Sequence, residues 1–171
     1  TLPGMRKRCV RIGSAGKTFS LTGWKVGYIT ANPSLLAPIA KAHQFLTFTT
    51  PPNLQAAVAF GLSKNNSYFS SLSGELEKCR DLLAAGLKDI GFGVMPCQGS
   101  YFITTDFRPL GFNGNDEEFC RHITIEARVA AVPVSAFYQG GGVEHFVRFC
   151  FCKEKKTLIE AIDRLRKHFD C

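Results

Sequence analysis

The stretch GSAGKTFSLTGWKVGY, residues 13–28, sets two lysines among small and hydroxyl-bearing residues just before an apolar run. Lys17 lies in its glycine-rich part, and Lys25 follows eight residues later. Glycine-rich loops that carry a lysine often handle phosphate. The stretch therefore raises two questions: which phosphate it binds, and whether Lys17 is only an electrostatic ligand or also a chemical reagent.

Three interpretations of Lys17 compete. The phosphate-binding loop of nucleotide-binding proteins, G-x-x-x-x-G-K-[ST], ends like residues 16–18, but its first glycine would replace Arg11. A second interpretation is a solvated surface lysine, which accounts for Lys17 by itself but does not explain why Ser14 and Lys25 lie near it in the sequence. The third interpretation is a Schiff-base lysine for pyridoxal phosphate, which combines a phosphate, a flat ring and an aldehyde. Burial and nearby positive charge would help such a lysine to be neutral part of the time.

The sequence pattern of the first third of the chain predicts two short strands and two helices. Strands are expected at 9–12 and 25–30, with a loop at Gly13–Gly16 between them. Asn32 is a suitable helix cap, and Pro33 suits the first helical position. A second helix, rich in small residues, is expected at 54–63. Two strands make a poor sheet on their own, so this part looks incomplete.

The rest of the chain mixes helices and strands in a second pattern. Helices are expected at 68–90, 116–126 and 157–169, and strands at 101–105, 129–134 and 145–151. The first of these helices has a predicted buried stripe at Leu76, Cys79, Leu83 and Leu87, and the last has one at Leu158, Ile162 and Leu165. The order indicates an α/β or α+β protein, and a composition shift near residues 50–65 suggests two domains, 1–60 and 61–171.

Composition excludes some classes of protein. The 171 residues contain 45% apolar residues and carry a net charge of +7, with no apolar run near the ~20 residues of a membrane helix. The seven cysteines include no Cys-x-x-Cys pair, which argues against a metal site and for free thiols in a reducing compartment. The positive charge would suit a non-catalytic anion-binding module. No aromatic-rich basic motif supports nucleic-acid binding.

Residues 13–27 resemble the lysine signature of the class I pyridoxal-phosphate aminotransferases. Lys25 stands where most of that family has arginine, and lysine there is characteristic of the kynurenine aminotransferase, glutamine transaminase K-like branch. The likeness covers nearly the whole chain and continues at residues 2–5 (LPGM), 43–44 (HQ), 55–59 (QAAVA), 98–102 (QGSYF), 132–138 (VPVSAFY) and 147–151 (VRFCF). It implies the C-terminal part of a fold-type I transferase: the end of the large α/β/α domain (1–60) and the small α+β domain (61–171).

The resemblance also implies roles for five residues. Lys17 would form the Schiff base with the cofactor and move the proton at the substrate α-carbon. Ser14 and Lys25 would bind the cofactor phosphate, and Arg148 the substrate α-carboxylate. Phe48 would reach toward the substrate pocket of the partner subunit in a homodimer.

The implied reaction moves an amino group from an L-amino acid to a 2-oxo acid. Aromatic amino acids, kynurenine, glutamine and methionine are all plausible donors. A cysteine-conjugate carbon–sulfur β-lyase would use the same residues, because both reactions begin with removal of the α-proton. A leaving group on the substrate β-carbon separates the two.

Some residues have simpler explanations. The Ser14 hydroxyl could cap a turn, and Arg148, on an apolar strand, could form a salt bridge inside its own domain. An arginine on a buried strand requires some anion in either case. Tyr101 and Phe137 are expected in the core rather than in a substrate pocket.

The family's residues for the pyridine ring precede its lysine in chain order. They are an aspartate, a tyrosine, a stacking aromatic and an asparagine, and no counterpart stands in the sixteen residues before Lys17. We therefore expect a C-terminal fragment without transaminase activity of its own. The expected compartment is intracellular, most simply the cytoplasm, with an organelle as the alternative because the N-terminus is missing.

Overall fold

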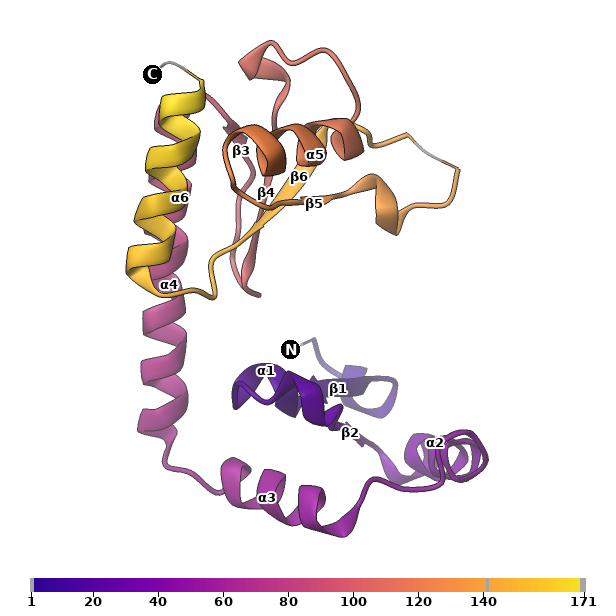
Figure 1. Cartoon of the computed structure of the whole chain (residues 1–171). Helices are drawn as coiled ribbons and strands as arrows, with labels where there is room; N and C mark the ends of the chain where they lie inside the picture. The colour runs from indigo at the N-terminus through magenta and orange to yellow at the C-terminus, as the bar shows by residue number, and fades with distance from the viewer. Residues whose placement is uncertain (1, 141, 170–171) are drawn as a thin grey trace. The chain divides into compact units, whose positions relative to one another are not determined.

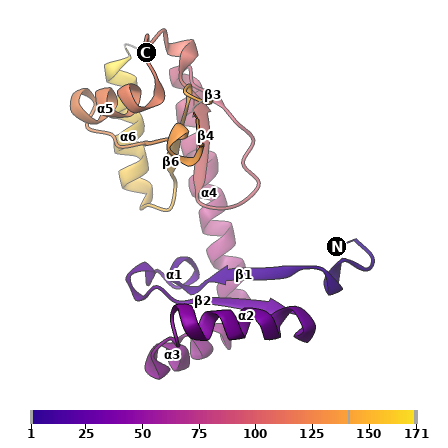
Figure 2. The same cartoon turned by 90° about the vertical axis from the view of Figure 1, so that its right-hand side faces the viewer.

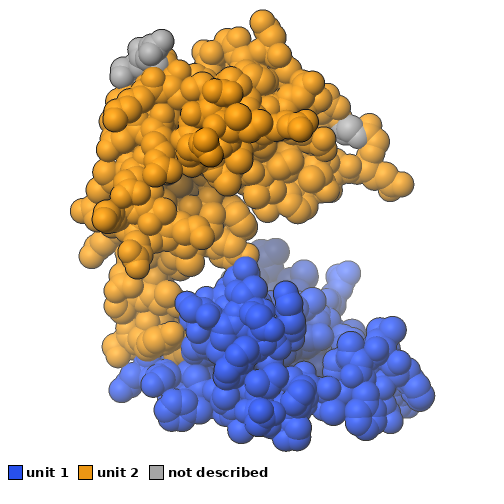
Figure 3. Space-filling view, viewed as in Figure 1, with its two compact units in different colours: residues 1–66 blue, residues 67–171 orange. Residues whose placement is uncertain are grey.

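The computed structural model describes residues 2–140 and 142–169. It contains two compact units, Thr1–Asn66 and Ser67–Cys171, coloured separately in Figure 3. Each unit is described by itself below. Within the described residues, no helix is long and apolar enough to cross a membrane.

The first unit is built on an antiparallel pair of strands, β1 (Val10–Ser14) and β2 (Gly27–Ala31), which lie side by side in Figure 2. Val10 faces Ala31 and Ser14 faces Gly27 across the pair. The 3₁₀ turn η1 (Met5–Lys7) precedes β1, while the short helix α1 (Ala15–Thr18) and the 3₁₀ turn η2 (Thr22–Trp24) join the strands.

The predicted loop at Gly13–Gly16 is wrong, because β1 continues to Ser14 and α1 begins at once. The Ala15 N–H donates to the Val26 carbonyl at 3.1 Å and extends the pairing past the strand end. The Gly16 carbonyl then accepts from the Leu21 N–H at 3.0 Å and from the Thr22 hydroxyl at 3.2 Å. These bonds fold the glycine-rich segment back over the end of the hairpin.

Two helices complete the first unit. The helix α2 (Pro33–Leu46) begins as predicted, with the Asn32 side chain accepting from the Ser34 N–H at 3.1 Å. The helix α3 (Pro52–Leu62) follows, and its Val58 is buried together with Ala15 and Val26. Within the described part of this unit, these three residues form the buried apolar cluster.

The second unit is a four-stranded antiparallel sheet with helices packed on one face (Figure 1). The strand order is β3-β4-β6-β5. The strands are β3 (Gly93–Val94), β4 (Phe102–Asp106), β5 (Val132–Pro133) and β6 (Phe146–Cys150). The helices are α4 (Asn66–Ile90), α5 (Asp116–Glu126) and α6 (Lys155–His168), and two 3₁₀ turns are η3 (Arg108–Leu110) and η4 (Ser135–Phe137).

Seventeen buried residues form one continuous core between this sheet and its helices. Phe119 of α5 lies at its centre, stacked on Phe107 with ring centroids 4.3 Å apart. The predicted stripes of α4 and α6 face this core, fully buried at Leu83, Leu87, Leu158, Ile162 and Leu165 and partly buried at Leu76 and Cys79.

The strand predicted at 129–134 is reduced to Val132–Pro133. Arg128 has a left-handed backbone (φ 57°), and the Val129 N–H donates back to the Ile123 carbonyl at 3.2 Å, so these residues close α5. Pro133 has no N–H with which to extend the pairing. Conversely, β3 was not predicted, because a two-residue strand carries no periodic signal.

The two units differ sharply in charge. Residues 1–66 contain eight lysines and arginines and neither aspartate nor glutamate. Residues 67–171 contain thirteen basic and fourteen acidic residues. The excess positive charge of the chain therefore belongs to the first unit.

Candidate active site

The lysine loop, which runs from the last residue of β1 to the residue before β2 (residues 14–26), brings three candidate residues to one end of the β1–β2 hairpin. Ser14 ends β1 opposite Gly27, Lys17 lies in α1, and Lys25 closes η2 two residues before β2. All three side chains are exposed. Ser14 occupies the cap position of α1 but its side chain makes no capping hydrogen bond, so the simpler explanation of this hydroxyl is not realised.

Two predicted site residues have left-handed backbones, Lys25 with φ 55° and Phe48 with φ 64°. This conformation is uncommon for residues other than glycine and is an outlier for a bulky one. It costs on the order of 1–3 kcal/mol and is typical of ligand-binding and active-site segments. Phe48 is 73% exposed just beyond the end of α2, so core packing does not explain its conformation.

The residues of this loop fit an anionic, phosphate-bearing cofactor. The donor set is one hydroxyl and two amines, and the sequence of residues 1–66, which contains eight lysines and arginines but neither aspartate nor glutamate, gives this unit a positive charge that attracts anions. Gly16 is required by the turn, because a Cβ there would lie 2.9 Å from the Thr22 Cα. Lys17 is exposed within the described residues, so burial by its own unit does not supply the environment expected for a reactive lysine.

Arg148 is the candidate residue of the second unit. It lies in β6, opposite Thr104 of β4 and Val132 of β5. Its strand neighbours Val147 and Phe149 are buried in the core, so Arg148 faces away from the helices. The charged group is therefore carried on the face of the sheet that the helices of this unit leave uncovered.

Two aromatic rings hold the guanidinium of Arg148. Its Cζ lies 4.2 Å from the ring centroid of Phe102 and 4.3 Å from that of Phe137. Its Nε is buried without a hydrogen-bond partner, and no ion pair among the described residues includes Arg148. The salt bridge considered as the simpler explanation is thus absent from the described part of the chain.

Phe137 was expected in the core but is 59% exposed. It belongs to η4, which follows β5 and lies outside the core, whereas Tyr101 is partly buried against the core as expected. Sequence reasoning missed both rings beside Arg148. The period-2 alternation of β4 could have placed Phe102 and Thr104 on one face, but the irregular turn that carries Phe137 has no comparable signal.

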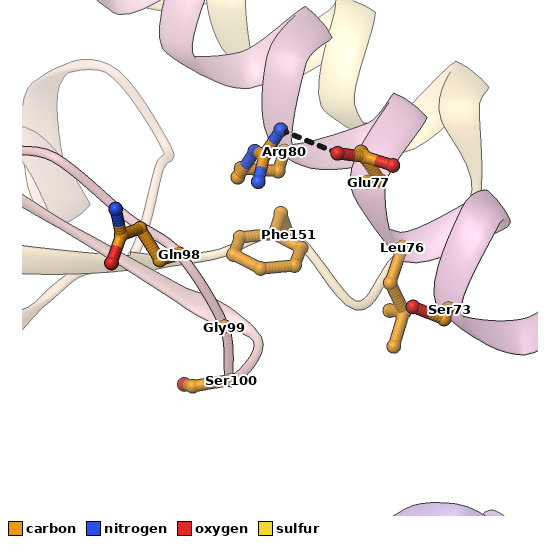
Figure 4. Close-up of a pocket in the computed structure, with 8 residues that line it drawn as sticks. All are labelled: Ser73, Leu76, Glu77, Arg80, Gln98, Gly99, Ser100 and Phe151. Carbon is orange, nitrogen blue, oxygen red and sulfur yellow. Dashed lines mark hydrogen bonds and ion pairs between the residues drawn. The ribbon is translucent and has the colours of Figure 1, made fainter.

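A cavity of about 190 Å³ lies between α4 and the turn at Gln98–Ser100 (Figure 4). Its cation, Arg80, is already paired with Glu77 at 3.2 Å and with Asp81 at 2.7 Å, and it also donates to the Cys97 carbonyl. Hydrogen bonds from Arg80 to these carboxylates raise the pKa of its guanidinium above the usual value. Arg148, unlike Arg80, has its positive charge available for a ligand.

The described residues contain no cluster of three or more histidine, cysteine or acidic side chains suited to a metal ion. The described cysteines, six of the seven in the chain, are free thiols.

Comparison with known proteins gives consistent matches. The family model "Aminotransferase class I and II" matches residues 4–165. The probable N-succinyldiaminopimelate aminotransferase DapC of Mycobacterium tuberculosis is 40% identical over 171 residues, covering 95% of this chain and 43% of the relative. The kynurenine–oxoglutarate transaminase of Dictyostelium discoideum is 38% identical over 187 residues, covering 98% and 43%.

Among solved structures, that of YbdL from Escherichia coli, for which a methionine aminotransferase function was identified, matches with a TM-score of 0.88 and 37% identity. The match covers 97% of this chain and 43% of that one. The chain thus spans about two fifths of the length of these relatives and corresponds to their C-terminal part. The expected α/β fold of a fold-type I transferase is confirmed, and the chain belongs to the class I and II aminotransferase family.

Proposed function

We propose that this chain contributes the C-terminal part of a pyridoxal-phosphate-dependent aminotransferase, and that the whole enzyme moves an amino group from an L-amino acid to a 2-oxo acid. The observation that carries the proposal is Arg148, a positive charge with no carboxylate against it in the described residues. A guanidinium fork binds a carboxylate in two parallel hydrogen bonds. Such a site suits the α-carboxylate that every donor amino acid and every acceptor oxo acid of this reaction carries.

The residues of the lysine loop divide the remaining tasks. The Lys17 amine would hold the cofactor and then accept and return the proton at the substrate α-carbon. The Ser14 hydroxyl and the Lys25 ammonium group would hold the phosphate. When bound, pyridoxal phosphate supplies an electron sink that makes the α-proton removable. An amine on a flexible stem suits this proton transfer because it can leave and re-approach the reacting carbon.

We propose substrates of the aromatic, kynurenine, glutamine or methionine type. The relatives above are named for kynurenine, methionine and N-succinyldiaminopimelate, which differ in their side chains. They share an amino group next to a carboxylate, which is the part of the substrate assigned here to Lys17 and Arg148.

We also propose that the protein works as a homodimer in which Phe48 contacts the substrate pocket of the partner subunit. The support is its exposure of 73% next to Phe45 and Leu46, which are 88% and 82% exposed. Three large apolar side chains in four residues are costly to leave in water and are typical of an interface.

Borohydride trapping tests the assignment of Lys17. Pyridoxal phosphate is added to the purified chain at a sub-saturating concentration, reduced, and located by peptide mass spectrometry. We expect the pyridoxyl group on Lys17, with Lys41 of α2 as the internal control for an exposed lysine in the same unit. Label scattered evenly over the surface lysines would contradict the proposal.

Substitutions distinguish specific phosphate binding by Lys25 and Ser14 from a general effect of positive charge in the unit. Lys25→Ala should lower labelling of Lys17 about ten- to hundredfold, because a hydrogen bond to a charged group is worth about 1.5–3 kcal/mol. Ser14→Ala should have a smaller effect in the same direction. Lys41→Ala removes the same charge from the same unit and should leave labelling of Lys17 unchanged. If Lys25→Ala and Lys41→Ala lower the labelling of Lys17 equally, Lys25 acts only through the net charge of the unit and is not a specific phosphate ligand.

A further inference from the structure

The rings beside Arg148 come from opposite neighbours of its strand. Phe102 belongs to β4, which pairs with one edge of β6, and Phe137 follows β5, which pairs with the other edge. A guanidinium is planar and its N–H groups point outward in that plane. The rings of Phe102 and Phe137, whose centroids lie 4.2 and 4.3 Å from the Arg148 Cζ, restrain the guanidinium by cation–π contact and contain no oxygen that could accept a hydrogen bond in place of a carboxylate.

The two rings are held in place in different ways. Phe102 is fixed by the pairing of β4 with β6. Phe137 is 59% exposed and lies outside the core, so apolar packing does not determine its position. Something else must fix the turn η4, because an exposed ring on an unrestrained turn would not stay over a cation.

Asp116 supplies that restraint. Its Oδ2 accepts a hydrogen bond from the Ser135 N–H at 2.7 Å, at the first residue of η4. The Val134 N–H donates to the Phe146 carbonyl at 3.1 Å and ties the same turn to β6. Together the two bonds anchor the start of the turn that carries Phe137.

The burial of Asp116 indicates that it has a specific role. It is 1% exposed, and its Oδ1 has no hydrogen-bond partner among the described residues. A buried carboxylate with one unsatisfied oxygen is costly, and an apolar residue at the start of α5 would avoid that cost. The bond to Ser135 is the feature that an apolar residue could not provide.

We propose that Phe137 and Asp116 are positioning residues for Arg148. Phe137 holds the guanidinium, together with Phe102, in the orientation that accepts a substrate carboxylate, and Asp116 holds the turn that presents Phe137. The inference rests on the proposed role of Arg148 as the carboxylate ligand. It assigns no contact between substrate and either positioning residue.

Carboxylate binding measured by NMR tests this proposal on the full chain. The probe is 3-phenylpropanoate, and neutral 3-phenylpropanamide is the matched control for binding without charge. Two signals are followed: the shift of the Arg148 side-chain protons, which lie close to two rings, and the dissociation constant of the probe. Arg148→Lys should weaken binding at least tenfold, because lysine lacks the bidentate fork.

Phe137→Leu should weaken carboxylate binding about three- to tenfold and move the Arg148 side-chain signals toward ordinary values. Tyr138→Leu is the matched control, since Tyr138 is the adjacent aromatic residue with nearly the same exposure, 56%, but makes no ring contact with Arg148 among the described residues. Unchanged signals and affinity in Phe137→Leu would overturn the proposal, as would equal losses in both variants.

Asp116 is tested by a pair of substitutions. Asp116→Ala should reproduce the Phe137→Leu effect on the Arg148 signals, while Asp116→Asn should largely restore them because its side-chain oxygen still accepts from Ser135. Equal losses in both would mean that the carboxylate charge matters rather than this bond, and would overturn the role assigned to Asp116. If Asp116→Ala does not fold, the comparison of Asp116→Asn with wild type and the exposed Phe137 variant still decide the proposal.

A failure of this inference is distinguishable from a failure of the proposed function. If wild type does not prefer 3-phenylpropanoate over the amide, Arg148 is not the carboxylate ligand and the positioning roles fall with it. Trapping of the cofactor on Lys17 is measured in the other unit and would support or contradict the proposed function by itself.

Discussion

The two units of the chain achieve their structures by different means. Among the described residues, the hydrophobic core of the second unit contains seventeen buried residues and that of the first unit contains three. The sequence of residues 67–171 nearly balances its charges, whereas that of residues 1–66 carries eight positive charges and no negative one. In the second unit, helices and strands are positioned by a shared core. In the first, backbone hydrogen bonds around Gly16 and a left-handed Lys25 shape the lysine loop. The comparison teaches that the candidate catalytic lysine depends on local backbone geometry, and the candidate carboxylate ligand on a packed scaffold.

Thiol reactivity should show the largest difference. Burial, together with nearby Asp116 and Glu117, raises the pKa of Cys120 to about 12. At pH 8 roughly one such thiol in 10⁴ is ionised, and the thiolate is the form that reacts. We expect iodoacetamide to modify buried Cys120 at least about 100-fold more slowly than exposed Cys9 of the first unit, as measured by mass spectrometry.

Exposed Cys152 is the control within the second unit, and it should react about as fast as Cys9. If both Cys120 and Cys152 react slowly, the difference from Cys9 reflects the second unit as a whole rather than the burial of Cys120. Rapid modification of Cys120 in the native chain would show that the core around α5 opens readily.

A matched pair of phenylalanines compares the two cores directly. Phe119→Ala removes a ring that is 0% exposed and should destabilise the second unit by about 3–5 kcal/mol. Phe60→Ala in the first unit removes a ring that is 68% exposed and should change stability by less than about 0.5 kcal/mol. Urea unfolding of both variants measures the difference. Similar losses would mean that Phe60 is covered in the folded protein and that the first unit has more core than three residues.

Acid stability should show the smallest of these effects. Hydrogen bonds from Arg108, the shortest at 2.6 Å, lower the pKa of the Asp106 carboxyl below its usual value. The carboxyl therefore stays charged in the folded state at pH values where the unfolded chain protonates it. The contribution of this pair is present above about pH 4 and is lost as the pH falls through the lowered pKa.

Substitution of the partner checks the sign. Arg108→Gln should reduce stability slightly at pH 7 and flatten the loss of stability below pH 4 in thermal unfolding. Arg121→Gln removes an exposed arginine of α5 that forms no ion pair among the described residues, and it should leave the acid profile unchanged. A profile that Arg108→Gln does not flatten would mean that solvent screens the pair completely.

The sequence predicted the parts of the fold in which one short signal dominates. Asn32 followed by Pro33 fixed the start of α2, and the expected helix 116–126 matches α5. The stripe of Leu158, Ile162 and Leu165 identified the buried face of α6. Each of these features depends on a side chain that caps its own helix or on apolar residues spaced at the helical period. Such signals can be recognised without knowing any contact between distant segments.

The parts that the sequence did not predict depend on contacts between distant segments. The strand expected at 129–134 is shortened by backbone bonds at Val129, and the loop expected at 13–16 is organised by Val26 and Thr22. The sequence could not decide whether Arg148 forms a salt bridge or binds a ligand. Its neighbour Phe137 is brought to it by a turn that has no periodic pattern, so this contact could not be predicted. The candidate roles of Lys17, Ser14, Lys25 and Phe48 remain predictions, and the trapping experiment addresses the first three.

The absence of acidic residues from positions 1–66 has a consequence for the proton inventory of folding. Carboxylates are the side chains that take up protons between about pH 5 and pH 2. All fourteen of the chain lie beyond residue 66, so unfolding of the first unit exchanges no protons through side-chain carboxylates in that interval. Proton uptake by carboxylates during acid unfolding would therefore report the unfolding of residues 67–171 alone, and no spectroscopic label would be needed to distinguish the two units.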